Sequence, residues 1–245
     1  MICAVHQPQY LPWPGYLSKL DAADVFVLYD DTQYKHNEWQ NRNRIKTANG
    51  VQWLTVPVHH HSDERIRDVR IDNRHAWARK HTNALAASYP RADHYGTYGP
   101  AFEAILGRRW DRLAELSAST IAALCDAVGF DTPTVRSSEL DYRGRATDAL
   151  VSICEAVGAG TYLSGPGGRA YLEPEKFAAA GLELLFHEFD PPRYPQPFGE
   201  FVPGLSAVDL LFNCGRAGAE LIRSARRLTE PDGAAVPART QREPR

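Results

Sequence analysis

The chain has 245 residues, 43% hydrophobic and 24% charged, which is enough apolar side chain for a sizeable core in one large domain or two closely joined ones. Its formal net charge is −2, so no overall field attracts nucleic acid or an acidic membrane, and we expect no nucleic-acid partner. No apolar stretch approaches the roughly 18 residues that span a bilayer, and MICAVHQP lacks the pattern of a secretion signal, so we expect a cytoplasmic protein without a membrane span.

The first elements in chain order form a βαβ unit. Apolar and β-branched runs at 2–6 and 25–30 predict strands, and PGYLSKLDAA between them has helical spacing with Pro14 in the first turn. Further along, 51–58 alternates like a strand, and 69–71 is a candidate partner for it.

Helices follow, and then strands and helices alternate. We expect a helix over 75–89 stopped by Pro90, and one or two helices over 101–128 ended by Gly129. The alternating elements are a strand at 134–138, a helix at 146–158, a strand at 161–164, a helix at 173–181, a strand at 182–189 and two closing helices within 206–228. Strands separated by such helices predict a parallel sheet covered on both faces.

The predicted fold class is therefore α/β, with a Rossmann-like, mostly parallel sheet and a helical insertion. We expect a single α/β domain over 1–228, made of an N-terminal βαβ part (1–74), the helical insertion (75–130) and a C-terminal α/β part (131–228). Residues 229–245 are rich in Pro, Gly, Ala and Arg and predict a disordered tail.

Three unusual loops follow predicted strands: HQPQYLPWPGY, DDTQY and SGPGGRAY. Ligands of open parallel sheets bind at the carboxyl ends of the strands, so we expect these loops to converge on one pocket. The first loop, stiffened by proline, is expected to form a pocket wall that holds His6 and Gln7 in place. Tyr10, Trp13 and Tyr171 are the aromatic candidates for substrate contact.

The candidate catalytic residues lie in the first two loops. His6 is the candidate general base, because imidazole titrates near neutrality, although a histidine that only pins the loop has the same sequence pattern. Asp30 and Asp31 would orient an amine or hold a metal, or serve as cap or turn residues. Gln33, or main-chain N–H groups, would stabilise an oxyanion, and Tyr34 would bond a substrate amide or sugar hydroxyl.

A polar cluster, WQNRNRIK, follows at 39–46. Arg42, Asn43 and Lys46 would hold a phosphate, and an asparagine such as Asn41 would bind a sugar or amide. Placed after DDTQY, the cluster suits the phosphate of a phosphopantetheine group or a sugar nucleotide; a solvated loop is the alternative.

The glycine-rich stretch SGPGG would cradle an anion, with Ser164 and Gly165 as substrate-binding residues. Ser164 lacks the spacing of a nucleophile elbow. HHHSD at 59–63 favours a solvated turn, because only His59, His61 and Asp63 could share an ion; no metal is expected. The scattered cysteines, Cys3, Cys125, Cys154 and Cys214, predict reduced and mostly buried thiols.

The stretch RYPQPFGEFVPGLSAVDLLFNCG ends the predicted fold. Tyr194 and Gln196 would reach over the pocket, while Asp209 and Asn213 lie one helical turn apart. They would bind substrate or form a buried polar pair that fixes the helix. Both interpretations predict that Asp209 is not on a solvated face.

These motifs carry a family resemblance. HQPQYLPWPGYLSKLDAADVFVLYDDTQY, WQNRNRIKT, WLTVPV, YLSG with AYL, RYPQPFGEF and LSAVDLLFNCG occur in the order typical of the WbqC-like family, over about residues 1–215. The resemblance implies a place in bacterial surface-polysaccharide or natural-product pathways and help in attaching acyl or aminoacyl groups to amino sugars or other amines.

A second resemblance is to HxGH-type nucleotidyltransferases and pantothenate synthetases, which join an acid to an amine through an acyl-adenylate. It rests on the strand, His, proline-containing loop, Gly and helix order, on FVLYDDTQY and on SGPGGRAYLEPEKF. The second histidine of that motif is replaced by Tyr16 after Gly15, and no Walker-type phosphate loop is present.

We expect an acyl- or aminoacyltransferase that forms an amide. The donor is a phosphopantetheine thioester on an acyl carrier protein or coenzyme A, no other cofactor is required, and the acceptor is an amino sugar or another small amine. Two alternatives stay open: an ATP-dependent, adenylate-forming amide ligase, and a non-catalytic module that binds a carrier protein or a glycan.

Overall fold

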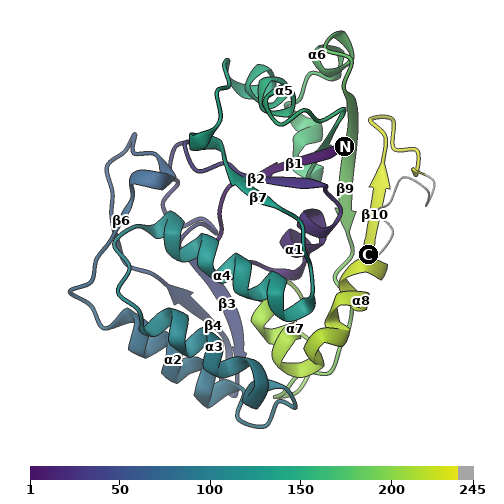
Figure 1. Cartoon of the computed structure of the whole chain (residues 1–245). Helices are drawn as coiled ribbons and strands as arrows, with labels where there is room; N and C mark the ends of the chain where they lie inside the picture. The colour runs from purple at the N-terminus through teal and green to yellow at the C-terminus, as the bar shows by residue number, and fades with distance from the viewer. Residues whose placement is uncertain (237–245) are drawn as a thin grey trace.

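A six-stranded sheet lies at the centre of the computed structural model, which describes residues 1–236 (Figure 1). The strand order is β10-β9-β8-β1-β2-β7, with five parallel strands and an antiparallel edge strand, β10. The strands are β1 (Ile2–His6), β2 (Val25–Leu28), β7 (Thr134–Arg136), β8 (Thr161–Ser164), β9 (Glu183–Phe189) and β10 (Arg226–Thr229). Numbered along the chain, this is the 3-2-1-4-5-6 order of a doubly wound sheet. The predicted Rossmann-like, mostly parallel sheet is confirmed.

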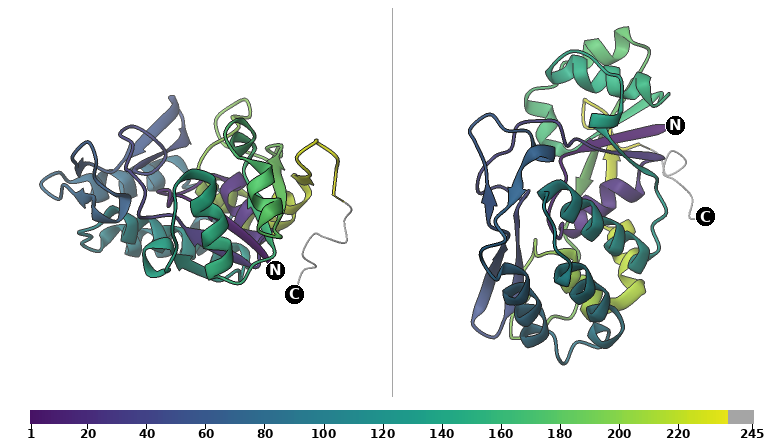
Figure 2. Two further views of the ribbon diagram at one scale, coloured as in Figure 1. Left: turned by 90° about the horizontal axis from the view of Figure 1, so that it is seen from above. Right: turned by 60° about the vertical axis from the view of Figure 1, so that its left-hand side comes forward.

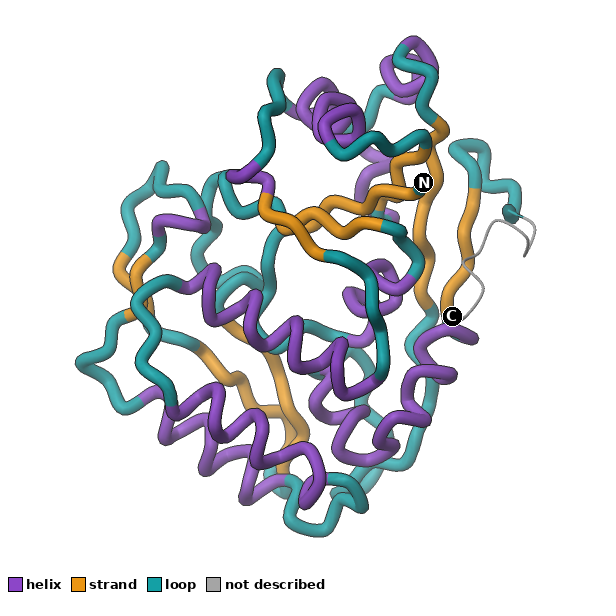
Figure 3. The backbone as a smooth tube through the Cα atoms, viewed as in Figure 1, coloured by secondary structure: helices purple, strands orange, loops and turns teal. Residues whose placement is uncertain are grey.

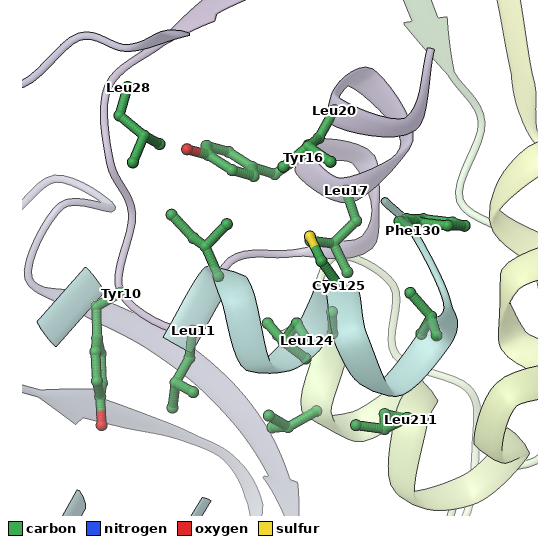
Figure 4. Close-up of a cluster of buried hydrophobic side chains, with 14 of the residues drawn as sticks. Tyr10, Leu11, Tyr16, Leu17, Leu20, Leu28, Leu124, Cys125, Phe130 and Leu211 are labelled. Carbon is green, nitrogen blue, oxygen red and sulfur yellow. The ribbon is translucent and has the colours of Figure 1, made fainter. Parts of the chain in front are cut away.

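Helices cover both faces of this sheet, because the side chains of each strand alternate between two apolar clusters. Ala4 and Phe26 belong to one cluster, and Cys3 and Val27 to the other. The first face is covered by α1 (Pro14–Asp21), α4 (Leu113–Val128), α7 (Ala207–Cys214) and α8 (Gly218–Ser224), and the second by α5 (Ala146–Ala156) and α6 (Pro174–Ala179). Figure 4 shows α1 and α4 side by side on the first face, with Tyr16, Leu17 and Leu20 near Leu124 and Cys125.

Residues 42–107, which precede α4 in the connection from β2 to β7, form a separate layer beside the sheet (Figures 2 and 3). Its elements are β3 (Arg42–Thr47), β4 (Gly50–Thr55), β5 (Val58–His59), β6 (Arg70–Ile71), α2 (Trp77–Ser88) and α3 (Tyr95–Gly107). The helix expected before Pro90 is α2. The strand expected over 51–58 is divided into β4, which pairs with β3, and β5, so that only Val58 of this segment pairs with the expected partner, at Ile71.

Two helices, α3 and α4, occupy the region where one or two were expected. The first begins at Tyr95, six residues before the expected start, although Pro100 lies inside it. Proline removes one main-chain N–H hydrogen bond from a helix. The Tyr95 hydroxyl donates to Glu103 at 2.8 Å, which links the helix residues before and after Pro100. The second ends as predicted at Gly129, whose φ of 80° provides the left-handed C-cap.

Two strands were not predicted. The polar cluster RNRIKT is β3, paired antiparallel with β4 rather than forming a loop. The segment RRLT is β10, which we expected to lie at the end of a helix. This arginine-containing segment can form a strand because both arginines have acidic partners: Arg226 donates to Asp21 at 2.6 Å, and Arg227 pairs with Glu188.

The chain is still in the sheet at Thr229, where we expected the disordered tail to begin. Thr229 and Val236 are buried, and Thr229 bridges to Ala235. The described chain therefore continues to pack on β10 beyond the expected boundary, and residues 237–245 lie outside the described residues.

The loop between β1 and α1 runs through the core instead of over the surface. Tyr10 and Leu11 are fully buried, and Leu11 has a φ of 44°. Its carbonyl groups are satisfied by distant segments: Asn43 Nδ2 donates to Leu11 O at 2.7 Å, and the Ala207 N–H donates to Pro12 O at 2.7 Å. Its prolines and aromatic side chains thus hold the sheet against the neighbouring layer.

A close packing contact lies at the start of α1. A Cβ added at Gly15 would lie 2.3 Å from a ring carbon of Trp13, and that ring packs edge-on against Phe189 at 5.4 Å between centroids. We expect Gly15→Ala to lower the free energy of unfolding by about 1–3 kcal/mol, as overpacking does. Urea unfolding measures it, with Gly96→Ala as control, because a Cβ at Gly96 meets nothing within 4 Å. Equal effects of the two substitutions would contradict this account.

Candidate active site between strands β1 and β8

A cavity of about 540 Å³ opens at the carboxyl ends of β1 and β8. These neighbouring strands lie where the strand order reverses, which is the place where doubly wound sheets bind their ligands. The lining residues with polar side chains are His6, Gln7, Lys19, Tyr29, Tyr162, Ser164 and Tyr171, and the stretch from Gly165 to Gly168 lines the cavity as well. The first and third of the unusual loops therefore meet here, as expected.

His6 is held in its neutral form. Its Nδ1–H donates to Gln7 O at 3.1 Å, because a carbonyl oxygen only accepts, so Nε2 is the acceptor nitrogen. Burial, and secondly the positive charge of Lys19, lower the His6 pKa from 6.5 to about 3. The ring lies 4.8 Å from that of Tyr16, edge to face. His6 thus presents an unprotonated imidazole to a cavity ligand at physiological pH.

Lys19 is the functional candidate that sequence reasoning missed. It lies in α1, all of whose residues are buried, and it is 4% exposed while lining the cavity. Its Nζ donates to Val5 O at 2.9 Å, and burial lowers its pKa from 10.5 to about 8. The signal available in the sequence was the position of this lysine in the predicted helix PGYLSKLDAA, which directly follows the first loop.

The glycine-rich loop brings main chain to the cavity. A Cβ added at Gly165 or Gly167 would meet nothing within 4 Å, whereas one at Gly168 would lie 2.1 Å from Ser164 Oγ. The Ser164 hydroxyl is buried and donates to Gly165 O at 3.0 Å, so it helps to shape the loop. Tyr171, 62% exposed, lies at the edge of the cavity.

Asp30 and Asp31 do not line the cavity. Asp30 is 1% exposed, and its carboxylate accepts from Ser138 N at 3.1 Å and Ser138 Oγ at 3.0 Å. Asp31 accepts from Ser137 Oγ at 2.5 Å and Tyr142 Oη at 2.8 Å. Both side chains join the end of β2 to the segment after β7, because a buried carboxylate needs such donors. The structure corrects their expected placement beside a substrate amine.

Among the neighbouring polar residues, only Gln7 reaches the cavity. Its Nε2 donates to Thr32 Oγ1 at 3.1 Å and its Oε1 accepts from Gln40 at 2.8 Å, which fixes the amide. Gln33 is exposed and bonds Ser62 O at 2.6 Å, away from the cavity. Tyr34 is buried in the core, where burial raises its pKa to about 12.

The polar cluster on β3 is largely buried and points elsewhere. Asn41 Nδ2 donates to Val56 O at 2.9 Å, and Asn43 bonds the first loop as described. Lys46 is 3% exposed, and its Nζ contacts Gln196 Oε1 and Gly199 O, both at 3.4 Å, and Glu200 O. Asn43 and Lys46, two of the residues expected to hold a phosphate, thus bond the chain's own carbonyl groups instead, and so does Asn41.

Arg42 is half-buried, as is Arg44. The Arg42 guanidinium lies 4.4 Å from the ring centroid of Trp53, and it donates to Asn37 O. It is not among the side chains that line the cavity.

Tyr10 and Trp13 do not form the expected pocket wall. Tyr10 Oη lies 2.9 Å from His81 Nδ1 within the core, and Trp13 packs on Phe189. The loop turns into the protein after Gln7, because Asn43 and Thr120 supply partners for its buried main chain.

The C-terminal polar residues form a second buried network. Asp209 is 0% exposed and accepts from Tyr89 Oη at 2.6 Å and Tyr194 Oη at 2.9 Å, which confirms that it is not on a solvated face. Gln196 donates to Val202 O at 3.0 Å, and Asn213 Nδ2 donates to Asp209 O at 2.7 Å. None of these four predicted site residues lines the cavity between β1 and β8, and their hydrogen bonds hold α7 and its loop together. Gln196 and Asn213 line a different cavity.

The described residues contain no group of three or more His, Cys, Asp or Glu side chains placed to hold a metal ion. His59 Nε2 lies 3.4 Å from Oδ1 of Asp72, the residue that directly follows β6. The four cysteines are free thiols, three of them buried and Cys214 half-buried. In the described part of the chain, no helix has the length and apolar character needed to cross a membrane.

The fold and cavity define a doubly wound α/β protein with a cavity at its topological switch point. A family model, the WbqC-like protein family, matches residues 7–220, and the chain belongs to this family. It is 34% identical over 227 residues, covering 91% of this chain and 98% of the relative, to "Uncharacterized protein Rv1507c" of Mycobacterium tuberculosis (strain ATCC 25618 / H37Rv). No solved structure matches the chain significantly.

Proposed function

We propose that this protein transfers an acyl or aminoacyl group from a thioester to an amine, forming an amide, in the cavity between β1 and β8. The observation that supports the proposal is the pairing, in one cavity, of a neutral histidine with an available acceptor nitrogen and a glycine-rich stretch of main chain. Amide formation needs a proton acceptor for the amine and donors for the developing oxyanion.

In the proposed reaction the amine nitrogen attacks the thioester carbonyl. The C–N bond forms and the C–S bond breaks, while the amine proton passes to His6 Nε2 and from there to the leaving thiolate. Main-chain N–H groups of the glycine-rich loop stabilise the oxyanion. Gln7 keeps one amide hydrogen for the substrate, because its other bonds to Thr32 and Gln40 hold it in position.

The roles first expected for Asp30, Asp31 and Gln33 are left out of this mechanism, because these side chains do not line the cavity. The His6 pKa of about 3, lowered chiefly by burial and secondly by Lys19, lies below the near-neutral value expected of a free imidazole. A negatively charged donor beside Lys19 would offset the second of these causes and raise the His6 pKa part of the way.

We expect His6→Gln to lower turnover by about 10²- to 10⁴-fold, as loss of a general base does. The assay combines the purified protein, an acyl thioester of coenzyme A or a carrier protein, and an amino sugar, and measures released thiol and amide mass. The control is His81→Gln, which replaces a buried neutral histidine outside the cavity. Turnover by folded His6→Gln protein at the wild-type rate would remove the base assignment.

A second candidate function, an ATP-dependent amide ligase, is favoured by the strand order, because the crevice at this switch point is where doubly wound sheets bind nucleotides. It predicts release of AMP and pyrophosphate when the free acid, ATP and the amine are supplied. Binding of these substrates without thiol or AMP release would favour a non-catalytic binding module.

A further inference from the structure

Lys19 is a buried cation whose charge the protein itself does not balance. Within residues 1–236, no carboxylate forms an ion pair with it, and its ammonium group donates to a single main-chain oxygen, Val5 O. An ammonium group has three hydrogens, so two remain for other acceptors. A buried charge without a partner is costly, which favours a ligand that supplies the missing negative charge.

Two other buried cations of this protein show the contrast. Lys46 Nζ is surrounded by three oxygen acceptors, and Arg226 pairs with Asp21 at 2.6 Å. Neither lines the cavity, whereas Lys19 does. Of these three cations, the one with a single oxygen partner is thus the one that lines the cavity.

The surroundings of Lys19 also favour an anion. The lining from Gly165 to Gly168 carries three glycines, and at Gly165 and Gly167 the space beside the main chain is open. A bulky anion can therefore approach the backbone there, as phosphate groups do in glycine-rich loops.

We propose that the cavity binds a phosphate-bearing ligand whose phosphoryl group is held by Lys19 Nζ against the glycine-rich loop. The proposal deepens the proposed function, because it names the group that the donor must carry. Coenzyme A, a phosphopantetheine arm and ATP share this phosphate chemistry. A cavity of about 540 Å³ has the size of a small-molecule site and can hold the part of such a ligand next to the phosphate.

The test is isothermal titration calorimetry of inorganic pyrophosphate, ATP, coenzyme A, phosphopantetheine and pantetheine against the wild type and Lys19→Met. We expect at least one phosphate-bearing probe to bind the wild type and to lose at least about tenfold in affinity in Lys19→Met. We also expect the substitution to raise the Tm, because it removes an unbalanced buried charge. Preference for ATP or for phosphopantetheine identifies the source of the phosphate.

The matched control is Lys46→Met, which removes a buried lysine outside the cavity. It should lower the Tm, because three oxygens lose their donor, and leave each Kd within about twofold. Unchanged affinity in Lys19→Met, no binding of any phosphate-bearing probe, or equal binding of pantetheine and phosphopantetheine would each overturn the proposal. The last two measurements use the wild type and do not depend on a variant that folds. Binding is read without turnover, so failure of the amide assay and failure of this proposal are distinguishable.

Discussion

Lowering the pH from about 7 to about 5 should reduce the free energy of unfolding by up to about 6 kcal/mol, from three buried histidines. The pKa values of His6, His81 and His187 are lowered from 6.5 to about 3, 4 and 3, in each case chiefly by burial. The unfolded chain binds a proton at each histidine below about pH 6.5, while the folded chain does not. Stability is therefore fully present above pH 6.5 and is lost as the pH falls toward these folded-state values, at about 2 kcal/mol for each histidine by pH 5.

Urea unfolding at a series of pH values measures this loss, and a matched variant assigns it. His81→Gln should reduce the slope of stability against pH by about one proton in this window. The difference between wild type and variant cancels the carboxyl groups, including Asp209, whose pKa is raised by burial and whose effect has the opposite sign. A wild-type stability that stays flat between pH 7 and 5, or a slope unchanged in His81→Gln, would contradict the assignment.

Asp30→Ala should lower the free energy of unfolding by about 3 kcal/mol, because it leaves buried donors without an acceptor. The carboxylate accepts from Ser138 N and Ser138 Oγ, and Ser137 Oγ lies 3.2 Å from it. These contacts tie the end of β2 to the segment after β7 at 1% exposure. Chemical denaturation of the purified variant measures the loss.

The matched control for Asp30→Ala is its neighbour, Asp31→Ala. Asp31 is half-buried and bonds two hydroxyl groups that water can reach more easily, so we expect a loss of about 1 kcal/mol. Asp30→Ala protein with wild-type stability and no turnover would contradict the structural role and return Asp30 to the catalytic residues.

The elements that the sequence predicts well are those with apolar side chains at regular spacing. β1, β2, β8 and β9 are nearly continuous apolar runs buried on both faces, and α2, α4 and α5 show helical spacing with clear ends. Hydrophobic periodicity, proline and glycine act over a few residues, so a single sequence is enough to read them.

β3 and β10 escaped prediction because charged side chains interrupt their pattern. Asn43 and Lys46 of β3 are buried by bonding carbonyl groups 32 and 154 residues away, Leu11 O and Glu200 O. The arginines of β10 are accommodated by Asp21 and Glu188. Burial of a polar side chain depends on its partner, and such distant partners leave no periodic signal.

The same distinction holds for the candidate site. The sequence by itself determined the α/β class, the order of most strands and helices, the family, and the meeting of the first and glycine-rich loops, because parallel strands place their carboxyl ends on one edge. Only the tertiary structure decided which side chains face the cavity. Of the predicted site residues, those that line it are His6, Gln7, Ser164, Gly165 and Tyr171, and Lys19 lines it without having been predicted. Asp30, Asn43, Lys46 and Asp209 are instead buried and bond other parts of the chain. The physical reason is that a polar residue is functional or structural according to the partners that surround it, and folding brings those partners from distant parts of the chain.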